Sequence, residues 1–238
     1  MSEALAAIRA SGMRNVIASA RALIFDVDGT LAETEEVHRR AFNEAFAQAG
    51  LDWCWDRATY RRLLRVTGGK ERIRAFDEQS AAPTLTSSAV ADLHRLKTAR
   101  YVDLVASGGC PLRPGVAAWL QSARRRGQRL AIATTTSHGN IDALLSVALG
   151  GDWGDLFEAI VAGDDVPRKK PAPDVYLEVL ARLGLAPADC IAIEDSGNGL
   201  AAASRAGIPV VITRSAYFGD DDWTGALVVV DNLLEFGP

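Results

Sequence analysis

The chain has 238 residues, of which 48% are hydrophobic and 24% are charged, a composition typical of a globular protein with one or two domains. Its formal net charge of −4 gives no broad attraction to nucleic acid or anionic lipid, because either needs a dense surface of lysine and arginine. The longest apolar stretches are far shorter than the roughly 20 residues of a membrane-spanning helix. Composition therefore predicts no nucleic-acid partner and no membrane partner.

The cysteines indicate the compartment. Cys54, Cys110 and Cys190 are odd in number and lack the spacing of a zinc site. We expect reduced thiols in a cytoplasmic protein, and we expect that protein to be a monomer. Residues 1–20 carry two arginines among alanine and serine without a contiguous apolar run, which predicts an N-terminal extension formed by a helix or a tail.

Short apolar runs that end in polar residues predict the strands of a parallel sheet, since strands buried on both faces are continuously hydrophobic. These runs are Ala22–Phe25, Leu130–Ala133, Cys190–Ile193, Pro209–Ile212 and Ala226–Val230. Helix patterns that end at glycine lie between them and begin near Pro114, Pro173 and Leu200. Strands that alternate with helices imply βαβ crossovers, so the predicted fold class is α/β with a doubly wound parallel sheet.

The stretch from 35 to 107 contains helical periods only and departs from this alternation. We expect it to form a helical insertion after the first strand, with hinges near Glu33–Glu36 and Gly108–Pro111. The α/β core would then comprise residues 21–34 and 108–238.

Acidic residues follow two of the predicted strands. Asp26 and Asp28 come directly after the first strand, and Glu194 and Asp195 come after Cys190–Ile193. Ligands of open α/β sheets bind at the carboxyl ends of the strands, where these acids would meet. Four carboxylates repel one another unless a cation lies among them, and Mg²⁺ prefers such oxygen ligands. An ordinary Asp-Gly turn would explain Asp28-Gly29 alone.

Hydroxyl and amine groups join the acids at the same edge. Thr134, Thr135 and Thr136 follow the second run, and Lys170 precedes the helix that leads into the Glu194 strand. A carboxylate nucleophile, a metal, a hydroxyl and a lysine together describe a phosphoryl-transfer site, where catalysis is largely positioning and charge neutralisation.

These four segments resemble, in order, the four motifs of the haloacid dehalogenase superfamily. Within it, Asp26–Glu36, Val37–Phe42, Thr67–Ile73 and His94–Thr98 are similar to the CbbY type. The resemblance implies a core with a helical cap inserted after the first strand. It also implies a phosphatase of a small phosphorylated sugar, such as the pentulose bisphosphate xylulose 1,5-bisphosphate.

The resemblance also implies a role for each core residue. Asp26 would be the nucleophile that forms an aspartyl phosphate, and Asp28 would be the general acid and base. Thr134 would hold the phosphoryl oxygens and Lys170 would bridge the phosphate and Asp26. The Mg²⁺ ligands would be Asp26, Asp28 through its carbonyl, Asp195 and Glu194.

Substrate contacts are expected around this centre. The chain has only four lysines, and Lys70 and Lys97 both fall in the insertion, so we favour them as contacts for a second phosphate; the alternative is a solvated surface charge. The remaining candidate substrate-binding residues are Glu33, His38, Gly69, Arg72, Thr135 and Thr136.

Two other functions stay open. A sugar phosphomutase of the β-phosphoglucomutase type would use the same core motifs, although Thr30 and the Gly68-Gly69-Lys70 segment favour a phosphatase. A phospho-acceptor signalling domain also gathers Asp, Thr and Lys at a sheet edge, but it would need neither Asp28 nor a cap. A nucleotide-binding Walker loop at Gly68-Gly69-Lys70 is excluded, because Leu64 and Glu71 occupy positions that need glycine and a hydroxyl residue.

Overall fold

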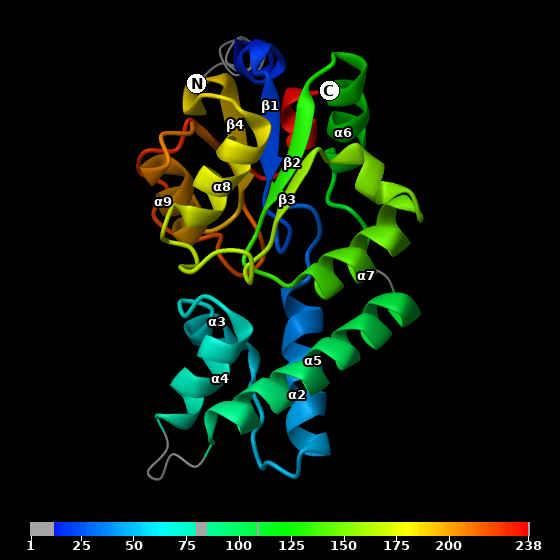
Figure 1. Cartoon of the computed structure of the whole chain (residues 1–238), viewed down its shortest axis with the longest axis vertical. Coiled ribbons are helices and arrows are strands. Elements are labelled where there is room, and N and C mark those ends of the chain that lie inside the picture. The colour runs from blue at the N-terminus through cyan, green and yellow to red at the C-terminus, as the bar shows by residue number, and fades with distance from the viewer. Residues whose placement is uncertain (1–11, 80–84, 109, 238) are drawn as a thin grey trace.

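A six-stranded parallel sheet forms the upper part of the molecule in Figure 1. The computed structural model describes residues 12–79, 85–108 and 110–237. The strand order is β3-β2-β1-β4-β5-β6, with β1 at the centre between β2 and β4. The strands are β1 (Ala22–Phe25), β2 (Arg129–Ala133), β3 (Ala159–Val161), β4 (Cys190–Glu194), β5 (Val210–Thr213) and β6 (Val228–Val230). The predicted α/β fold class with a doubly wound parallel sheet is confirmed.

Helices cover both faces of the sheet, and alternate strand residues explain how. Successive side chains of a strand point to opposite faces, so Leu23 and Phe25 of β1 belong to one buried cluster, and Ala22 and Ile24 belong to the other. Figure 1 shows α6 and α7 on one side of the sheet and α8 and α9 on the other. These helices are α6 (Val116–Arg125), α7 (His138–Leu149), α8 (Asp174–Leu183) and α9 (Gly197–Arg205).

Four helices form a second part below the sheet, inserted between β1 and α6 (Figure 1). They are α2 (Glu35–Gln48), α3 (Arg57–Leu63), α4 (Gly69–Asp77) and α5 (Ser87–Gly108). We call this part the cap. Its own apolar core is built on aromatic side chains such as Phe42, Trp55 and Tyr60, and Tyr217 from the sheet domain packs into it. The cap therefore has a core of its own, to which the sheet domain contributes the ring of Tyr217.

The predicted strands agree with the observed ones to within one residue, apart from β6, which is two residues shorter. Strand β3 was not predicted, because three residues at the sheet edge carry too little hydrophobic pattern. Helix α9 begins at Gly197, three residues earlier than predicted, because Ser196 caps it by accepting a hydrogen bond from the Gly199 amide. The predicted domain boundaries stay a prediction.

The end of the predicted N-terminal extension packs against the sheet domain. Residues 12–19 are helical, Ile17 is buried, and Gln128 donates hydrogen bonds to the carbonyls of Ile17 and Ala20. The rest of the extension lies outside the described residues. Across the described ranges, no helix is both long and apolar enough to cross a bilayer.

Candidate active site

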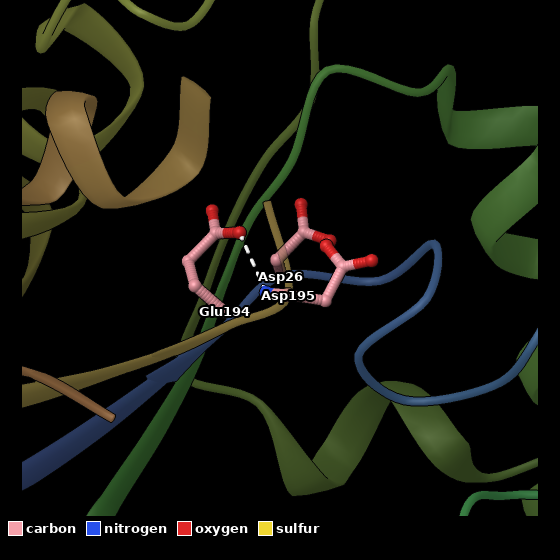
Figure 2. A group of neighbouring side chains, drawn as sticks. All are labelled: Asp26, Glu194 and Asp195. Carbon is pink, nitrogen blue, oxygen red and sulfur yellow. Dashed lines mark hydrogen bonds between the residues drawn. The ribbon is translucent and has the colours of Figure 1, made fainter. Parts of the chain in front are cut away.

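The ends of the two central strands bring three carboxylates together. Phe25 of β1 pairs with Ile193 of β4, so Asp26 leaves the sheet beside Glu194 and Asp195. One oxygen of each of the three side chains lies within 4.8 Å of the others. Figure 2 shows the three carboxylates gathered where the two strands end. All three side chains are buried, so their charges must be compensated inside the protein.

Lys170 supplies part of that compensation. Its Nζ lies 2.7 Å from Asp26 Oδ1, 2.6 Å from Glu194 Oε1 and 2.8 Å from the carbonyl oxygen of Ala133. Burial by itself lowers the pKa of Lys170, but the charges of Asp26 and Glu194 outweigh burial and raise the pKa above its usual value. The amine is therefore a fixed ammonium that touches the candidate nucleophile.

Glu194 is saturated with hydrogen bonds. Its Oε1 accepts from Lys170 and from the Tyr176 hydroxyl at 2.7 Å, and its Oε2 accepts from the backbone amide of Asp195 at 3.1 Å. A Cβ at Gly199 would lie 2.0 Å from this carboxylate, so α9 approaches it closely because residue 199 is glycine. With both oxygens engaged, Glu194 holds Lys170 in place more directly than it could bind an ion.

The two aspartates fit a divalent cation better. Burial and the charge of Glu194 raise the pKa of Asp26 to about 8 against the opposing effect of Lys170. Burial and the charges of Asp26 and Glu194 raise the pKa of Asp195 well above its usual range, and its Oδ2 is buried without a hydrogen-bond partner. An unpaired buried oxygen beside a second crowded carboxylate is the donor set that a hard cation would satisfy.

The loop after β2 adds hydroxyl groups. Thr134, Thr135 and Thr136 all line the cavity in front of Asp26. The Thr134 Oγ1 accepts from the Thr136 amide at 3.3 Å, and the Thr136 hydroxyl accepts from Asn140 Nδ2 at 2.9 Å. A Cβ at Gly163 would lie 2.2 Å from the Thr135 carbonyl, so this loop is also packed tightly from behind.

Asp28 is held by the cap. Its Oδ1 accepts from the Thr34 hydroxyl at 2.6 Å and lies 2.9 Å from His38 Nε2. On the other side of the imidazole, Nδ1 lies 2.6 Å from Lys97 Nζ, and the ring stacks on Tyr101 at 4.1 Å. A line of three side chains thus runs from the catalytic loop into the core of the cap.

The charges along this line determine the tautomer of His38. Burial and the nearby Lys97 charge lower the pKa of His38, which favours a neutral ring. Burial also lowers the pKa of Lys97 to about 7. While Lys97 is an ammonium it can only donate to Nδ1, which places the ring proton on Nε2, where it is donated to Asp28. Burial opposes ionisation of Asp28, but its contacts with His38 and Thr34 outweigh burial and keep its pKa below the usual value.

A cavity that is open to solvent lies between the cap and the sheet edge. Of the candidate substrate-binding residues, His38, Gly69, Lys70, Arg72, Lys97, Thr135 and Thr136 line it. Lys97 is 3% exposed and engaged with His38. Glu33 lies outside the lining and contacts Arg113 at 3.3 Å in the first hinge. Asp26, Asp28, Thr134, Lys170 and Asp195 line the sheet side of the same cavity.

Several lining residues were not identified from the sequence. His94 belongs to them, and burial followed by the charges of Lys97 and Lys70 lowers its pKa to about 3, so it is a neutral group among cations. Lys169 and Asn198 also line the cavity. The spacing of His94 and Lys97, one helical turn apart, was an available signal for His94. Lys169 and Asn198 could be identified as lining residues only once the position of the cap against the sheet domain was known.

The chain was compared with known proteins. A family profile described as haloacid dehalogenase-like hydrolase matches residues 20–207. This match runs from β1 to α9 and includes Asp26, Asp28, Thr134, Lys170, Glu194 and Asp195. The chain belongs to the haloacid dehalogenase-like hydrolases. The resemblance stated from the motifs is thereby confirmed, and hydrolases of this family generally use a divalent metal, which agrees with the buried acidic cluster.

Similar haloacid dehalogenase-like hydrolases carry the name CbbY. The CbbY protein of Rhodobacter capsulatus is 56% identical over 206 residues, which are 87% of this chain and 90% of that protein. A crystal structure of CbbY from Rhodobacter sphaeroides in complex with phosphate is 48% identical, with a TM-score of 0.88 over 92% of this chain and 96% of that one. A mutant of the same protein, 47% identical with the same TM-score, was crystallised with xylulose 1,5-bisphosphate.

Proposed function

We propose that this hydrolase is a Mg²⁺-dependent phosphatase of a small sugar bisphosphate, and that a pentulose bisphosphate such as xylulose 1,5-bisphosphate is its substrate. The observation that carries the proposal is the position of Asp26. Its buried carboxylate contacts a fixed ammonium, adjoins a second unpaired carboxylate and faces a cavity lined by cations at the far end. The similar protein that binds xylulose 1,5-bisphosphate supports the choice of substrate.

The first step requires a nucleophile and charge neutralisation. A free oxygen of Asp26 attacks phosphorus, the bond to the sugar oxygen breaks, and an aspartyl phosphate forms. The Lys170 ammonium and the Thr134 hydroxyl stabilise the equatorial phosphoryl oxygens. Mg²⁺, held by Asp26, Asp195 and the backbone carbonyl of Asp28, would supply further positive charge when bound.

Both steps require a proton carrier. In the first step Asp28 must take up a proton from solvent, because its contacts with Thr34 and His38 favour the carboxylate at rest, and it passes this proton to the departing sugar oxygen. As a carboxylate it then removes a proton from the water that attacks the aspartyl phosphate in the second step. Its contacts with Thr34 and His38 fix the carboxylate near the nucleophile loop. Because His38 comes from the cap, Asp28 is correctly held only when the cap lies over the site.

The second phosphate would bind at the cap end of the cavity. Lys70 and Arg72 supply positive charge there, and Arg72 is held by hydrogen bonds to the Leu63 carbonyl and the Tyr60 hydroxyl, both at 3.2 Å. Lys97 lines the same cavity and also contacts His38. Cations at both ends suit a substrate with a phosphate at each end.

We also infer a cytoplasmic monomer. The three cysteines are free, as expected for a reducing compartment.

The test is phosphate release with Mg²⁺ from four compounds: xylulose 1,5-bisphosphate, ribulose 1,5-bisphosphate, fructose 1,6-bisphosphate and β-glucose 1-phosphate. We expect the highest kcat/KM with a pentulose bisphosphate, and no release from any compound by the Asp26→Asn variant. Conversion of β-glucose 1-phosphate to glucose 6-phosphate at a higher rate than phosphate release would show a mutase instead. A single stoichiometric phosphorylation without turnover would indicate a phospho-acceptor domain.

A further inference from the structure

Two ion pairs cross between the cap and the sheet domain at the rim of the cavity. Lys169 Nζ lies 2.9 and 3.0 Å from the two carboxylate oxygens of Glu71, and Lys70 Nζ lies 3.6 Å from Asp164. The charges are reciprocal, because α4 of the cap supplies Lys70 and Glu71 while the loop after β3 supplies Asp164 and Lys169. The contact between Glu71 and Lys169 forms no part of the mechanism proposed above.

The ion pair between Glu71 and Lys169 has the shorter distances of the two. Both carboxylate oxygens of Glu71 engage the ammonium, and the Lys169 side chain is only 18% exposed. Asn198 reinforces the contact from the sheet side, since its Nδ2 donates to Thr67 Oγ1 at 3.0 Å. The Glu71 side chain is 46% exposed, so the pair lies at the edge of the contact between the two parts of the molecule, with the ammonium shielded and the carboxylate partly open to solvent.

Glycine residues in the cap leave room for this ion pair. Gly68 has a φ of +100°, and a Cβ there would lie 2.1 Å from Glu71 Oε2 and 2.8 Å from Lys169 Nζ. A Cβ at the next residue, Gly69, would lie 2.5 Å from His94 Nε2. The Gly68-Gly69 doublet thus has a physical reason, which is to leave room for the ion pair on one side and for His94 on the other.

The position of Lys169 in the chain links the pair to catalysis. Lys169 directly precedes Lys170, whose ammonium contacts Asp26 and Glu194 inside the site. The two neighbouring lysines point to different partners, one in the cap and one at the nucleophile. Anchoring Lys169 to Glu71 therefore fixes the backbone from which the catalytic ammonium projects.

We propose that Glu71 and Lys169 are positioning residues, whose ion pair holds the cap against the loop after β3 and thereby places Lys170 on Asp26. The proposal rests on the proposed phosphatase activity for its kinetic readout. It predicts that breaking the pair from either side has the same effect, and that the effect falls on kcat. If Lys169 instead bound the substrate phosphate, its loss would raise KM, and removal of Glu71 would leave KM unchanged or lower it.

The experiment is a double-mutant cycle of Glu71→Gln and Lys169→Gln, assayed with a pentulose bisphosphate and with p-nitrophenyl phosphate. We expect each single variant to lower kcat about two- to fivefold with both substrates, and the double variant to lose no more than the worse single one. Lys169→Arg, which keeps the charge, should restore most of kcat. Glu78→Gln, at the exposed end of the same helix, is the matched control and should match the wild type.

Additive losses in the cycle, or a loss in Lys169→Gln that appears in KM alone, would overturn the proposal. Hydrogen exchange of the backbone amides at 66–72 supplies a readout that needs no substrate, and it should accelerate equally in both single variants. Unchanged exchange in both would also overturn it. If the wild type hydrolyses neither substrate, the phosphatase proposal fails, and the exchange measurement still decides whether the pair holds the cap.

Discussion

The position of Asp28 depends on a series of side-chain contacts that reaches into the cap. Its carboxylate contacts His38, His38 contacts Lys97, and Lys97 is buried between the rings of Phe42 and Tyr101 at 4.9 and 5.1 Å. Burying an ammonium costs free energy that the protein recovers only in part through such cation–π contacts. The arrangement is best explained by function, because it fixes the tautomer of the imidazole that orients the proton carrier.

The buried lysine should make stability depend on pH. The pKa of Lys97 falls from 10.5 to about 7 on folding, so between these values the unfolded chain binds the proton more strongly than the folded one. The contribution of Lys97 to the free energy of unfolding therefore rises with pH in this window. Below pH 7 this contribution is at its lowest, so Lys97 stabilises the folded state least there. Relative to Lys97→Met, the wild type should gain about 3 kcal/mol between pH 7 and pH 9.5. Urea unfolding at both pH values measures this; a constant difference would contradict it.

The elements explain why the catalytic groups meet. Strands β2, β1 and β4 are adjacent and parallel, so the loops after them place Thr134, Asp26 and Asp195 at one edge. The close approach of α9 then supports the carboxylate of Glu194, which in turn holds Lys170. Glu194 is therefore a positioning residue for the catalytic amine, and α9 is part of its support.

Adding one methyl group to α9 should disturb this support. In Gly199→Ala the new Cβ would lie 2.0 Å from the Glu194 carboxylate, so the carboxylate and Lys170 must shift. We expect kcat to fall on the order of 100-fold, as for other displacements of about 1 Å in an active site. Gly139→Ala is the matched control, because a Cβ in that first turn of α7 meets nothing within 4 Å. Steady-state kinetics of both variants decide the point, and full activity of Gly199→Ala would refute the supporting role.

At the scale of the whole molecule, the sheet domain could be predicted from the sequence. For the cap, the sequence predicted a helical insertion but not its contacts with the sheet domain. Residues such as Asp26 and Asp195 follow directly from strand ends, because parallel strands share one functional edge. The contacts of Lys97 and Lys169 depend on how two separately packed parts approach each other, which local pattern does not encode. Lys97 contacts His38 as well as lining the cavity, and Lys169 contacts Glu71 of the cap.

The approach of the cap also defines what the site encloses. With the cap over the sheet edge, the cavity has Asp26 and Lys170 on the sheet side and Lys70 and Arg72 on the cap side. Water is then restricted at the nucleophile, and His38 contacts Asp28 in the same arrangement. In the proposed mechanism, Asp26 accepts the phosphoryl group and Asp28 controls its release.

The most direct measurement is the mass of the Asp28→Ala variant after incubation with a pentulose bisphosphate and Mg²⁺. Without the proton carrier the aspartyl phosphate should form slowly and persist, so we expect one phosphoryl group on the peptide that contains Asp26. The same adduct should be absent in the Asp26→Asn variant and after removal of divalent ions with a chelator. An unmodified Asp26, or normal phosphate turnover by Asp28→Ala, would contradict the account.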